Sequence, residues 1–407
     1  MYTGQNKVIS NSLSKHTHLD IFTSIDQIDE IWDAFVPNDS SLLKSAYLKT
    51  VEKNPPNNMR FYYVVYKQHS VIKAISIFQS YVIKAKDSIN NEKYETVEQN
   101  PYCVINAIAK SFKALLINHT ELHLIINGNM LLTGEFGNYS LPNFDLSNHM
   151  DRAFNLVSKK VQQTKRQAGL YLIKDYKEDC QPWNRSLEDK EYKAIKMQPS
   201  MLLPIADHWI TTEDYLSDIT SKYRVRYKKA RAVSSDITKK EFTLSDCQTH
   251  QETINILYKK VADSVGFNAF TLHENYFISL KDRLGDKYKI YGYFIDNHLI
   301  AFYTIIIHDN VNYAHFLGYD KSINRKYKLY LNILYDILEI SIANKVHCID
   351  FARTALEIKS TLGAEPVEML CFFKHKNYFS NKFWNFVYDY LNPKEDWIQR
   401  KPFKKKE

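Results

Sequence analysis

Three scarcities limit what this sequence can encode. Glycine accounts for only 10 of the 407 residues, which disfavours glycine-rich phosphate loops. The five cysteines are widely spread and include no CxxC pair, so neither a disulfide framework nor a metal site is indicated, and a reducing cytoplasm fits. The longest apolar run, residues 299–307, is far shorter than the ~20 residues that span a bilayer, and no charged-then-apolar signal opens the chain. We therefore expect a cytoplasmic protein that does not cross a membrane.

What the sequence does contain indicates a globular protein of two domains. Apolar residues make up 44% and charged residues 25% of the chain, which is enough apolar material for a packed core. The length suits two domains of ~150–200 residues each. The 29 tyrosines and 22 phenylalanines favour a strand-rich interior with large clefts.

The net charge of +8 is modest, but it is unevenly distributed. Residues 222–240 hold eight basic residues against one acid, Asp236, and five of the last eight residues are basic. We expect both basic segments to face acidic partners. Nucleic acid is not expected among them, because the overall charge is low and no nucleic-acid-binding motif is present.

A repeated pattern of elements suggests that the chain is duplicated. Each half contains two strands joined by a short turn, then a strand, a helix and a further strand. In the first half these elements are residues 61–66, 71–82, 122–136, 150–167 and 170–174. In the second half they are residues 288–295, 299–307, 312–317, 328–344 and 347–350. A helix between two strands of one sheet implies a right-handed parallel crossover. The pattern predicts an α/β fold of two tandem halves, each a mixed sheet with flanking helices.

The boundary between the halves is predicted where a charged stretch, residues 188–191, gives way to a new strand at 201–205. A helix start follows, because the hydroxyl and carboxylate residues of 211–214 precede apolar positions. We therefore expect domains at 1–196 and 197–392, followed by a basic tail at 393–407.

The basic segment at residues 215–231 is the first candidate binding element. If it is helical, Arg224, Lys228 and Arg231 lie along one side and form a cationic ridge suited to phosphate or to an acidic carrier protein. Arg226 belongs to the same segment. The alternative is an ordinary solvated helix face.

The second candidate is the strand at residues 312–320, which ends in Gly-Tyr-Asp and leads into a helix. Open α/β sheets place ligands where strand carboxyl ends meet helix amino termini. His315 has an ordinary pKa suited to taking a proton from an amine, and Tyr319 is placed to donate to an oxyanion or to a leaving thiolate. Alternatively, His315 is a packed, hydrogen-bonded strand residue.

The third candidate, residues 350–364, opens at the next strand end and closes at Gly363, a predicted helix stop. Arg353 can fork onto phosphate or carboxylate, and Lys359 supplies a point charge. Glu357 is a candidate base, or a residue that orients His315. A surface network of ion pairs is the alternative.

The aromatic segment at residues 378–391, together with the basic tail, fits a helix lying on an anionic membrane surface. A core helix followed by a solvated tail fits equally well. The first alternative would make the protein peripheral on the inner face of the membrane.

Several of these segments together carry a family resemblance. They are residues 350–369 and 374–377, the ridge at 223–226 and the strand at 316–319, with 132–137 in the first half. The sequence resembles bacterial double-GNAT acetyltransferase-domain proteins, which are related to Fem-type peptidoglycan aminoacyl transferases and to bacterial ceramide synthases. The resemblance covers the second half well and the first half only by its hairpin pattern. It implies a tandem GNAT fold, with the candidate site in the second half and a degenerate first half.

One departure from the resembled pattern concerns the donor. Ordinary acetyltransferases place a glycine-rich turn on the coenzyme A pyrophosphate, whereas residues 324–329 contain no glycine. The resemblance therefore implies an acyl donor held by charge, either acyl-CoA or acyl carrier protein, with no permanently bound cofactor. Arg224, Arg226, Arg353 and Lys359 are the residues expected to hold its phosphate.

The expected function is N-acylation of a long-chain aminolipid, as in the ceramide synthase relatives, by an acyltransferase that uses His315 or Glu357 as base and Tyr319 as acid. Fem-type aminoacyl transfer to a cell-wall precursor is the first alternative, although no sustained heptads indicate the coiled-coil arm of many such relatives. A non-catalytic lipid- or carrier-binding module is the second.

Overall fold

The first half of the chain folds in the predicted order of elements. The computed structural model describes residues 17–84, 121–163, 169–177, 181–263, 270–377 and 397–404. The first half contains β1 (Thr17–Phe22), the 3-10 turn η1 (Ile25–Gln27), α2 (Asp29–Phe35), α3 (Ser45–Lys53), β2 (Arg60–Gln68), β3 (Val71–Lys84), β4 (Glu121–Asn127), β5 (Asn138–Ser140), η2 (Leu146–His149), α7 (Met150–Gln162), β6 (Leu170–Lys177) and α8 (Gln181–Glu188). The predicted strand at 122–136 stops at Asn127, because the chain turns at Gly128, whose φ is +135°.

The second half repeats this order. It contains β7 (Lys193–Pro204), α9 (Thr212–Asp218), α10 (Ser221–Ala232), β8 (Thr238–Glu241), α11 (Leu244–Thr249), α12 (Gln251–Ala262), α13 (Tyr276–Leu284), η3 (Gly285–Lys287), β9 (Tyr288–Ile295), β10 (His298–His308), β11 (Val311–Tyr319), α14 (Lys321–Tyr327), α15 (Leu329–Ala343), β12 (Cys348–Asp350), α16 (Leu356–Ser360) and β13 (Glu365–His375). The parallel pairs β4·β6 and β11·β12 flank α7 and α15, as the predicted crossovers require.

Both predicted hairpins are confirmed, and they turn in the same way. The turn between β2 and β3 has positive φ at His69 (49°) and Ser70 (66°). The turn between β9 and β10 has positive φ at Asp296 (48°) and Asn297 (64°). Two successive left-handed residues match the right-handed twist of the flanking strands, so each hairpin closes in two residues.

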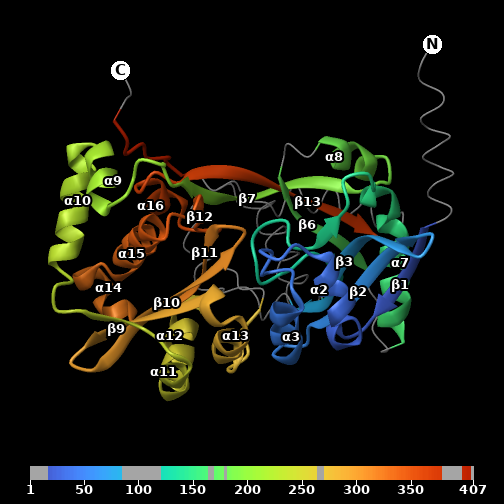
Figure 1. Ribbon diagram of the computed structural model, residues 1–407, viewed down its shortest axis with the longest axis horizontal. Coiled ribbons are helices and arrows are strands. Elements are labelled where there is room, and N and C mark those ends of the chain that lie inside the picture. Colours follow the sequence, from blue (N-terminus) through green and yellow to red (C-terminus); the bar gives the residue numbers. More distant parts are fainter. Residues whose placement is uncertain are drawn as a thin grey trace, which may run out of the picture.

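The two halves are joined by exchanging their last strands. All thirteen described strands form one sheet, in the order β1-β2-β3-β4-β6-β13-β7-β12-β11-β10-β9-β8, with β5 beside β3. Strand β7 follows β6 but pairs with β12, and β13 follows β12 but pairs with β6 (Figure 1). The two exchanged strands also pair with each other. The expected boundary at residue 196 therefore falls inside β7, which lies between β13 and β12 in the continuous sheet.

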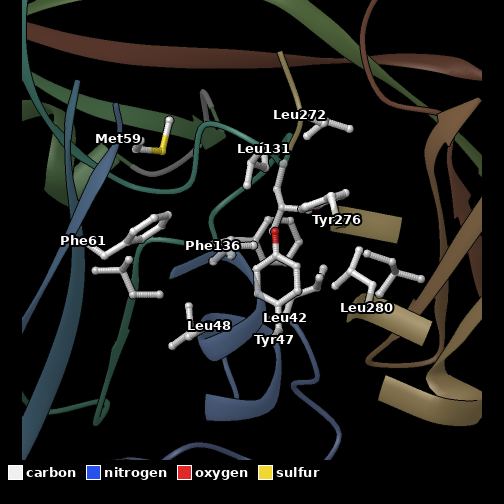
Figure 2. Close-up of a cluster of buried hydrophobic side chains, with 14 of the residues drawn as sticks. Leu42, Tyr47, Leu48, Met59, Phe61, Leu131, Phe136, Leu272, Tyr276 and Leu280 are labelled. Atoms are coloured by element: carbon white, nitrogen blue, oxygen red, sulfur yellow. The ribbon is translucent and has the colours of Figure 1, made fainter. Parts of the chain in front are cut away.

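Helices cover both faces of this mixed sheet, which confirms the predicted α/β class. One face carries α2 and α3 from the first half beside α11 to α13 from the second, and a single hydrophobic core spans both groups. Figure 2 shows this core, in which Tyr47 and Leu48 of α3 lie opposite Tyr276 and Leu280 of α13. On the other face α7 packs over the first half and α15 over the second.

The segments flanking α9 and α10 differ from expectation. The helix expected over 215–231 is broken at Ile219, whose φ of −85° and ψ of 156° are extended, so α9 and α10 are separate. Part of the expected tail fills this break, because the Thr220 amide donates to the Pro402 carbonyl at 2.9 Å. The aromatic segment 378–391 lies outside the described residues. No helix in the described ranges has the length and apolar character needed to cross a bilayer.

Candidate functional site

In the second half, strands β11 and β12 separate after a short paired stretch. The two strands pair in parallel at only three positions, from Val311 opposite Cys348 to Tyr313 opposite Asp350. Beyond Tyr313, β11 continues to Tyr319 and pairs with β10 on its other side. No strand among the described residues pairs with the edge of β11 that faces away from β10 there. Backbone N–H and C=O groups along this edge are therefore available to an extended ligand.

A β-bulge lies where β11 separates from β12. Ala314 is opposite Ile305 and Leu317 is opposite Tyr303, so β11 has one extra residue at this point. The hydroxyl of Thr304 fills the gap, because it accepts from the Phe316 amide at 3.0 Å and donates to the Phe316 carbonyl at 2.9 Å.

The bulge turns His315 and Phe316 toward the same helix. Both rings contact the ring of Tyr276, the first residue of α13, with centroids 5.8 and 6.0 Å away respectively. Nε2 of His315 lies 2.7 Å from the Tyr276 hydroxyl oxygen. Burial lowers the pKa of His315 to about 3, so the imidazole is neutral at pH 7. The ordinary histidine pKa on which the expected base role depended is therefore not that of the folded protein.

Tyr319 lies at the end of β11 on the opposite face, toward α15. Its ring centroid is 6.2 Å from that of Tyr330. Burial raises the pKa of Tyr319, so its hydroxyl keeps its proton near neutral pH, as an acid for a leaving thiolate requires.

A strained turn follows Asp350 at the end of β12. Three of its residues are not glycine yet have positive φ: Ala352 (55°), Thr354 (68°) and Ala355 (48°). Lys359 holds this turn, because its Nζ donates to the carbonyls of Ala352 at 3.1 Å and Arg353 at 2.6 Å. Backbone strain of this kind persists only where its surroundings impose it, and it is concentrated at functional sites.

Asp350 was not singled out from the sequence, yet it lies at the point where β11 and β12 separate. Its Oδ1 accepts from the Ser200 hydroxyl at 2.6 Å and from the Ala352 amide at 2.7 Å. Burial raises the pKa of Asp350 and lowers that of Lys359 to about 7. The signal that could have identified Asp350 is its place at the carboxyl end of a parallel strand.

Arg353 belongs to the join between the halves. Its Nε donates to the Gln198 carbonyl at 2.9 Å, and its Nη2 pairs with Asp175. Asp175 is fully buried and also pairs with Lys174. Burial alone would raise the pKa of Asp175, but the two cations hold it below the ordinary value. The donors of Arg353 and Lys359, expected to hold phosphate, thus have partners inside the protein.

Glu357 lies apart from His315. Its half-exposed carboxylate on α16 accepts from Nε of Arg400 at 2.9 Å. The structure therefore does not bring the two expected bases together, and Glu357 takes part in a surface ion pair, which was the alternative for this segment.

The expected cationic ridge is partly used within the fold. Arg224 donates to the Ile219 carbonyl at 2.5 Å and so caps α9. Arg231 pairs with Asp336 at 2.7 Å and with Glu339 at 2.5 Å on α15. The remaining basic residues of α10 lie toward solvent, with Arg226 half-buried and Lys222, Lys228 and Lys229 exposed.

Helix α14 extends this basic surface. Arg325 and Lys326 are exposed on it. The Tyr327 hydroxyl and, to a smaller extent, the charge of Asp236 just beyond α10 raise the pKa of Lys326. Lys328 separates α14 from α15 with φ 50° and ψ 44°, a left-handed conformation that glycine would adopt more easily. The segment without glycine thus forms a short helix and a lysine at the start of α15.

A hollow of about 430 Å³ lies elsewhere, in the first half. It is lined by Thr23, Glu52, Met59, Arg60, Phe61, Tyr62, Lys160 and Gln163. None of these residues belongs to β11, β12 or the strained turn, so this hollow is separate from the candidate site.

Comparisons with known proteins identify one family model and several solved structures that are similar to this chain. Residues 221–360 match the family model described as an acetyltransferase (GNAT) domain. The crystal structure of FemX aligns over 91% of this chain and 100% of its own, with 11% identity and a TM-score of 0.52. A tandem GNAT protein from the clavulanic acid biosynthesis pathway covers 88% and 99%, with 9% identity and a TM-score of 0.48. No curated protein matches the chain.

A further solved structure is the C-terminal domain (DUF2156) of a putative lysylphosphatidylglycerol synthetase from Agrobacterium fabrum. It covers 90% of this chain and 98% of its own, with 8% identity and a TM-score of 0.47. The match at residues 221–360 places a GNAT acetyltransferase domain in the second half, and the chain shares its fold with FemX over 91% of its length. The GNAT domain at residues 221–360 supports an acyltransferase, because GNAT domains join an acyl-CoA donor to an amine acceptor.

Proposed function

We propose that the protein transfers a fatty acyl group from acyl-CoA to the amine of a long-chain aminolipid. The observation that carries this proposal is the opening between β11 and β12, where β11 is unpaired on one edge beyond Tyr313. The pantetheine arm of coenzyme A is an extended chain with two amides. It can pair with an open strand edge as an added strand does.

The donor phosphates would bind the basic surface of α10 and α14. Of the residues expected to hold them, Arg226 is the one whose guanidinium has no hydrogen-bond partner among the described residues. Lys228, Lys229, Arg325 and Lys326 are exposed near it on the two helices. Arg224, Arg353 and Lys359 donate to internal acceptors, so we assign them to structure instead. An acidic carrier protein would meet the same surface.

In the proposed reaction a C–N bond forms between the amine and the acyl carbon, and the C–S bond to coenzyme A breaks. Asp350 takes the proton that the amine loses, because its raised pKa brings it closer to neutral pH. The departing thiolate takes a proton from solvent, because Tyr319 lies on the opposite face of β11, six residues beyond the position paired with Asp350. Glu357 is paired with Arg400 and is not needed.

The acceptor is assigned to a membrane lipid because exposed apolar side chains lie among the basic residues of α10. Val225 is 49% exposed and Val233 is 40% exposed on or just after α10, among its lysines, and Ile210 nearby in sequence is 67% exposed. Apolar insertion combined with attraction to anionic lipid holds peripheral proteins at the cytoplasmic membrane face.

The test is to incubate the protein with sphinganine and either palmitoyl-CoA or palmitoyl-acyl carrier protein, and to measure amide product by mass spectrometry. We expect product with palmitoyl-CoA, and at least 100-fold less product from Asp350→Asn at unchanged donor KM. Product from the carrier protein alone would reassign the donor. Absence of product with both donors would overturn the proposal and favour a binding module.

A second candidate is Fem-type aminoacyl transfer to a cell-wall precursor, which the fold shared with FemX favours. Incubation with aminoacyl-tRNA and a peptidoglycan precursor tests it, and aminoacylated precursor would support this reading over lipid acylation.

A further inference from the structure

Residues 397–404 form a docked segment that connects α9 to α16 (Figure 1). At one end of this segment Phe403 makes an antiparallel bridge with Ile219, in the break between α9 and α10. Two backbone hydrogen bonds of 2.9 Å flank the bridge, one from the Thr220 amide and one to the Asp218 carbonyl. The docked segment is therefore held to α9 through its backbone.

The ring of Phe403 fills a cradle between α9 and the residues after α16. It stacks on Trp209 with centroids 5.8 Å apart and meets Tyr215 at right angles with centroids 6.3 Å apart. Gly363 leaves room for the ring, because a Cβ there would lie 2.2 Å from it. The Tyr215 hydroxyl donates to the Leu362 carbonyl at 3.1 Å. Phe403 thus packs against both sides of the junction.

Arg400, in the same segment, contacts α16 near both of its ends. Its amide donates to the Ser360 hydroxyl oxygen at 2.9 Å, and its Nε donates to the Glu357 carboxylate at 2.9 Å. The Ser360 hydroxyl in turn donates to the Glu357 carbonyl at 2.7 Å. These contacts flank Lys359, whose side chain is only 3% exposed. The docked segment therefore holds the helix that carries Lys359.

Lys359 extends this support to the candidate site. Its Nζ donates to the carbonyls of Ala352 and Arg353 in the strained turn. The Ala352 amide donates to Oδ1 of Asp350 at 2.7 Å. A turn with positive φ at Ala352 and Ala355 persists only where its surroundings impose it. A continuous series of contacts thus runs from the docked segment to the carboxylate assigned as the base.

We propose that Phe403 is a positioning residue for Asp350. By seating the docked segment, Phe403 holds α16, and through Lys359 it holds the strained turn, so that the carboxylate stays aimed at the acceptor amine. This proposal rests on the proposed acyl transfer. Misplacement of a reacting group by about 1 Å can cost about 10²-fold in rate. Loss of the Phe403 ring should therefore lower kcat more than it changes the donor KM.

Hydrogen exchange tests the structural step without any activity. Full-length protein and Phe403→Ala are compared by mass spectrometry. We expect amides within residues 352–364 to exchange at least about tenfold faster in the variant, because the turn and α16 lose their support. Ile398→Ala is the matched control, since Ile398 belongs to the docked segment but is 60% exposed, and no change is expected. Unchanged exchange of residues 352–364 in Phe403→Ala would overturn the proposal.

The catalytic step is tested in the full-length chain with palmitoyl-CoA and sphinganine. We expect kcat to fall about 10- to 100-fold in Phe403→Ala and less in Phe403→Leu, which keeps an apolar side chain, with the donor KM changed less than about threefold. In an Asp350→Asn background, Phe403→Ala should cause little further loss, because the docked segment acts through this carboxylate.

Equal losses from Phe403→Ala with and without the Asp350 carboxylate would show that the ring does not act through it, and would overturn the positioning role. Absence of product from the unmodified protein would instead refute the proposed function. The exchange result would still decide whether the docked segment holds the turn.

Discussion

Asp175 and Arg353 are 178 residues apart in the sequence and form an ion pair at the join between the two halves. Asp175 belongs to β6 of the first half, and Arg353 belongs to the strained turn that follows β12 of the second. The pair therefore connects β6, where the exchanged strand β13 pairs, to the turn whose carbonyls accept hydrogen bonds from Lys359. The buried Asp175 carboxylate, with its two cationic partners, fixes the position of β6 relative to the turn after β12.

Removal of Asp175 should destabilise the protein strongly. Asp175→Ala leaves the charges of Lys174 and Arg353 in a dry site, for which we expect a loss of about 3–5 kcal/mol in the free energy of unfolding. Urea denaturation measures this loss. Asp286→Ala is the matched control, because its side chain is 99% exposed in its pair with Lys289, and a change within about 0.5 kcal/mol is expected. Similar changes in both variants would show that the buried pair has no special role.

The strand exchange predicts that the first half does not fold alone. Leu370 and Phe372 of β13 lie in the core beneath α7, and β13 covers the edge of β6. A fragment of residues 1–192 should therefore aggregate or remain unfolded, as judged by circular dichroism and gel filtration. Co-expression with residues 193–407 should restore a soluble complex. A folded, monomeric 1–192 fragment would contradict the exchange.

Gly318 should tolerate no side chain, because β11 meets α12 there. A Cβ at Gly318 would lie 2.5 Å from the Leu257 carbonyl carbon and from the Tyr258 amide nitrogen. We expect Gly318→Ala to lower the free energy of unfolding by at least about 1–3 kcal/mol. Gly169→Ala is the control, since its added Cβ would meet only the His375 ring at 3.4 Å. Thermal unfolding compares the two.

Buried histidines should make the protein less stable in mild acid. Burial lowers the pKa of His308 to about 4, so below the unfolded value of about 6.5 the unfolded chain binds more protons than the folded protein. Stability should therefore fall as the pH drops from 7 toward 4, by about 2 kcal/mol between pH 7 and 5 for this residue.

His308→Asn tests this contribution, because the asparagine oxygen can still accept from the Leu42 amide, which donates to Nδ1 of His308 at 3.0 Å. The variant should show a flatter dependence of unfolding free energy on pH between 5 and 7. An unchanged slope would mean that His308 has the same pKa in the folded protein as in the unfolded chain.

The tyrosine pair should couple the halves energetically. Tyr47→Phe and Tyr276→Phe each leave a buried group without its partner, at a cost of about 1–3 kcal/mol. The double variant should cost less than the sum of the two, with an interaction of about 0.5–3 kcal/mol in a double-mutant cycle from urea denaturation. Strict additivity would indicate that the two hydroxyls do not interact.

Local elements of the fold were predictable because their signals are local. The hairpin turns at 69–70 and 296–297 and the strand, helix, strand order after them depend on periodicity and turn chemistry within a few residues. The break at Ile219 was not predicted, since it depends on residue 402, which is distant in sequence.

The candidate site was only partly predictable. The sequence placed His315, Tyr319 and the segment after Asp350 near strand ends. The parallel pairing brings the end of β12 beside Tyr313, two residues before His315, whereas Tyr319 lies six residues beyond Tyr313. The sequence could not separate the charges used inside the fold from those left in solvent. Glu357 and Arg353 have partners 43 and 178 residues away, and only the folded chain brings these together.

The sequence by itself determined the duplicated α/β order, because hydrophobic period and turn residues act over short distances. It also determined that residues 324–329 offer no glycine turn to a donor. The tertiary structure alone decided that the last strands change places, that Tyr276 lies within hydrogen-bond distance of His315, and that burial lowers the pKa of this histidine. Hydrogen-bond polarity and desolvation depend on which distant groups surround a side chain, and no local pattern records them.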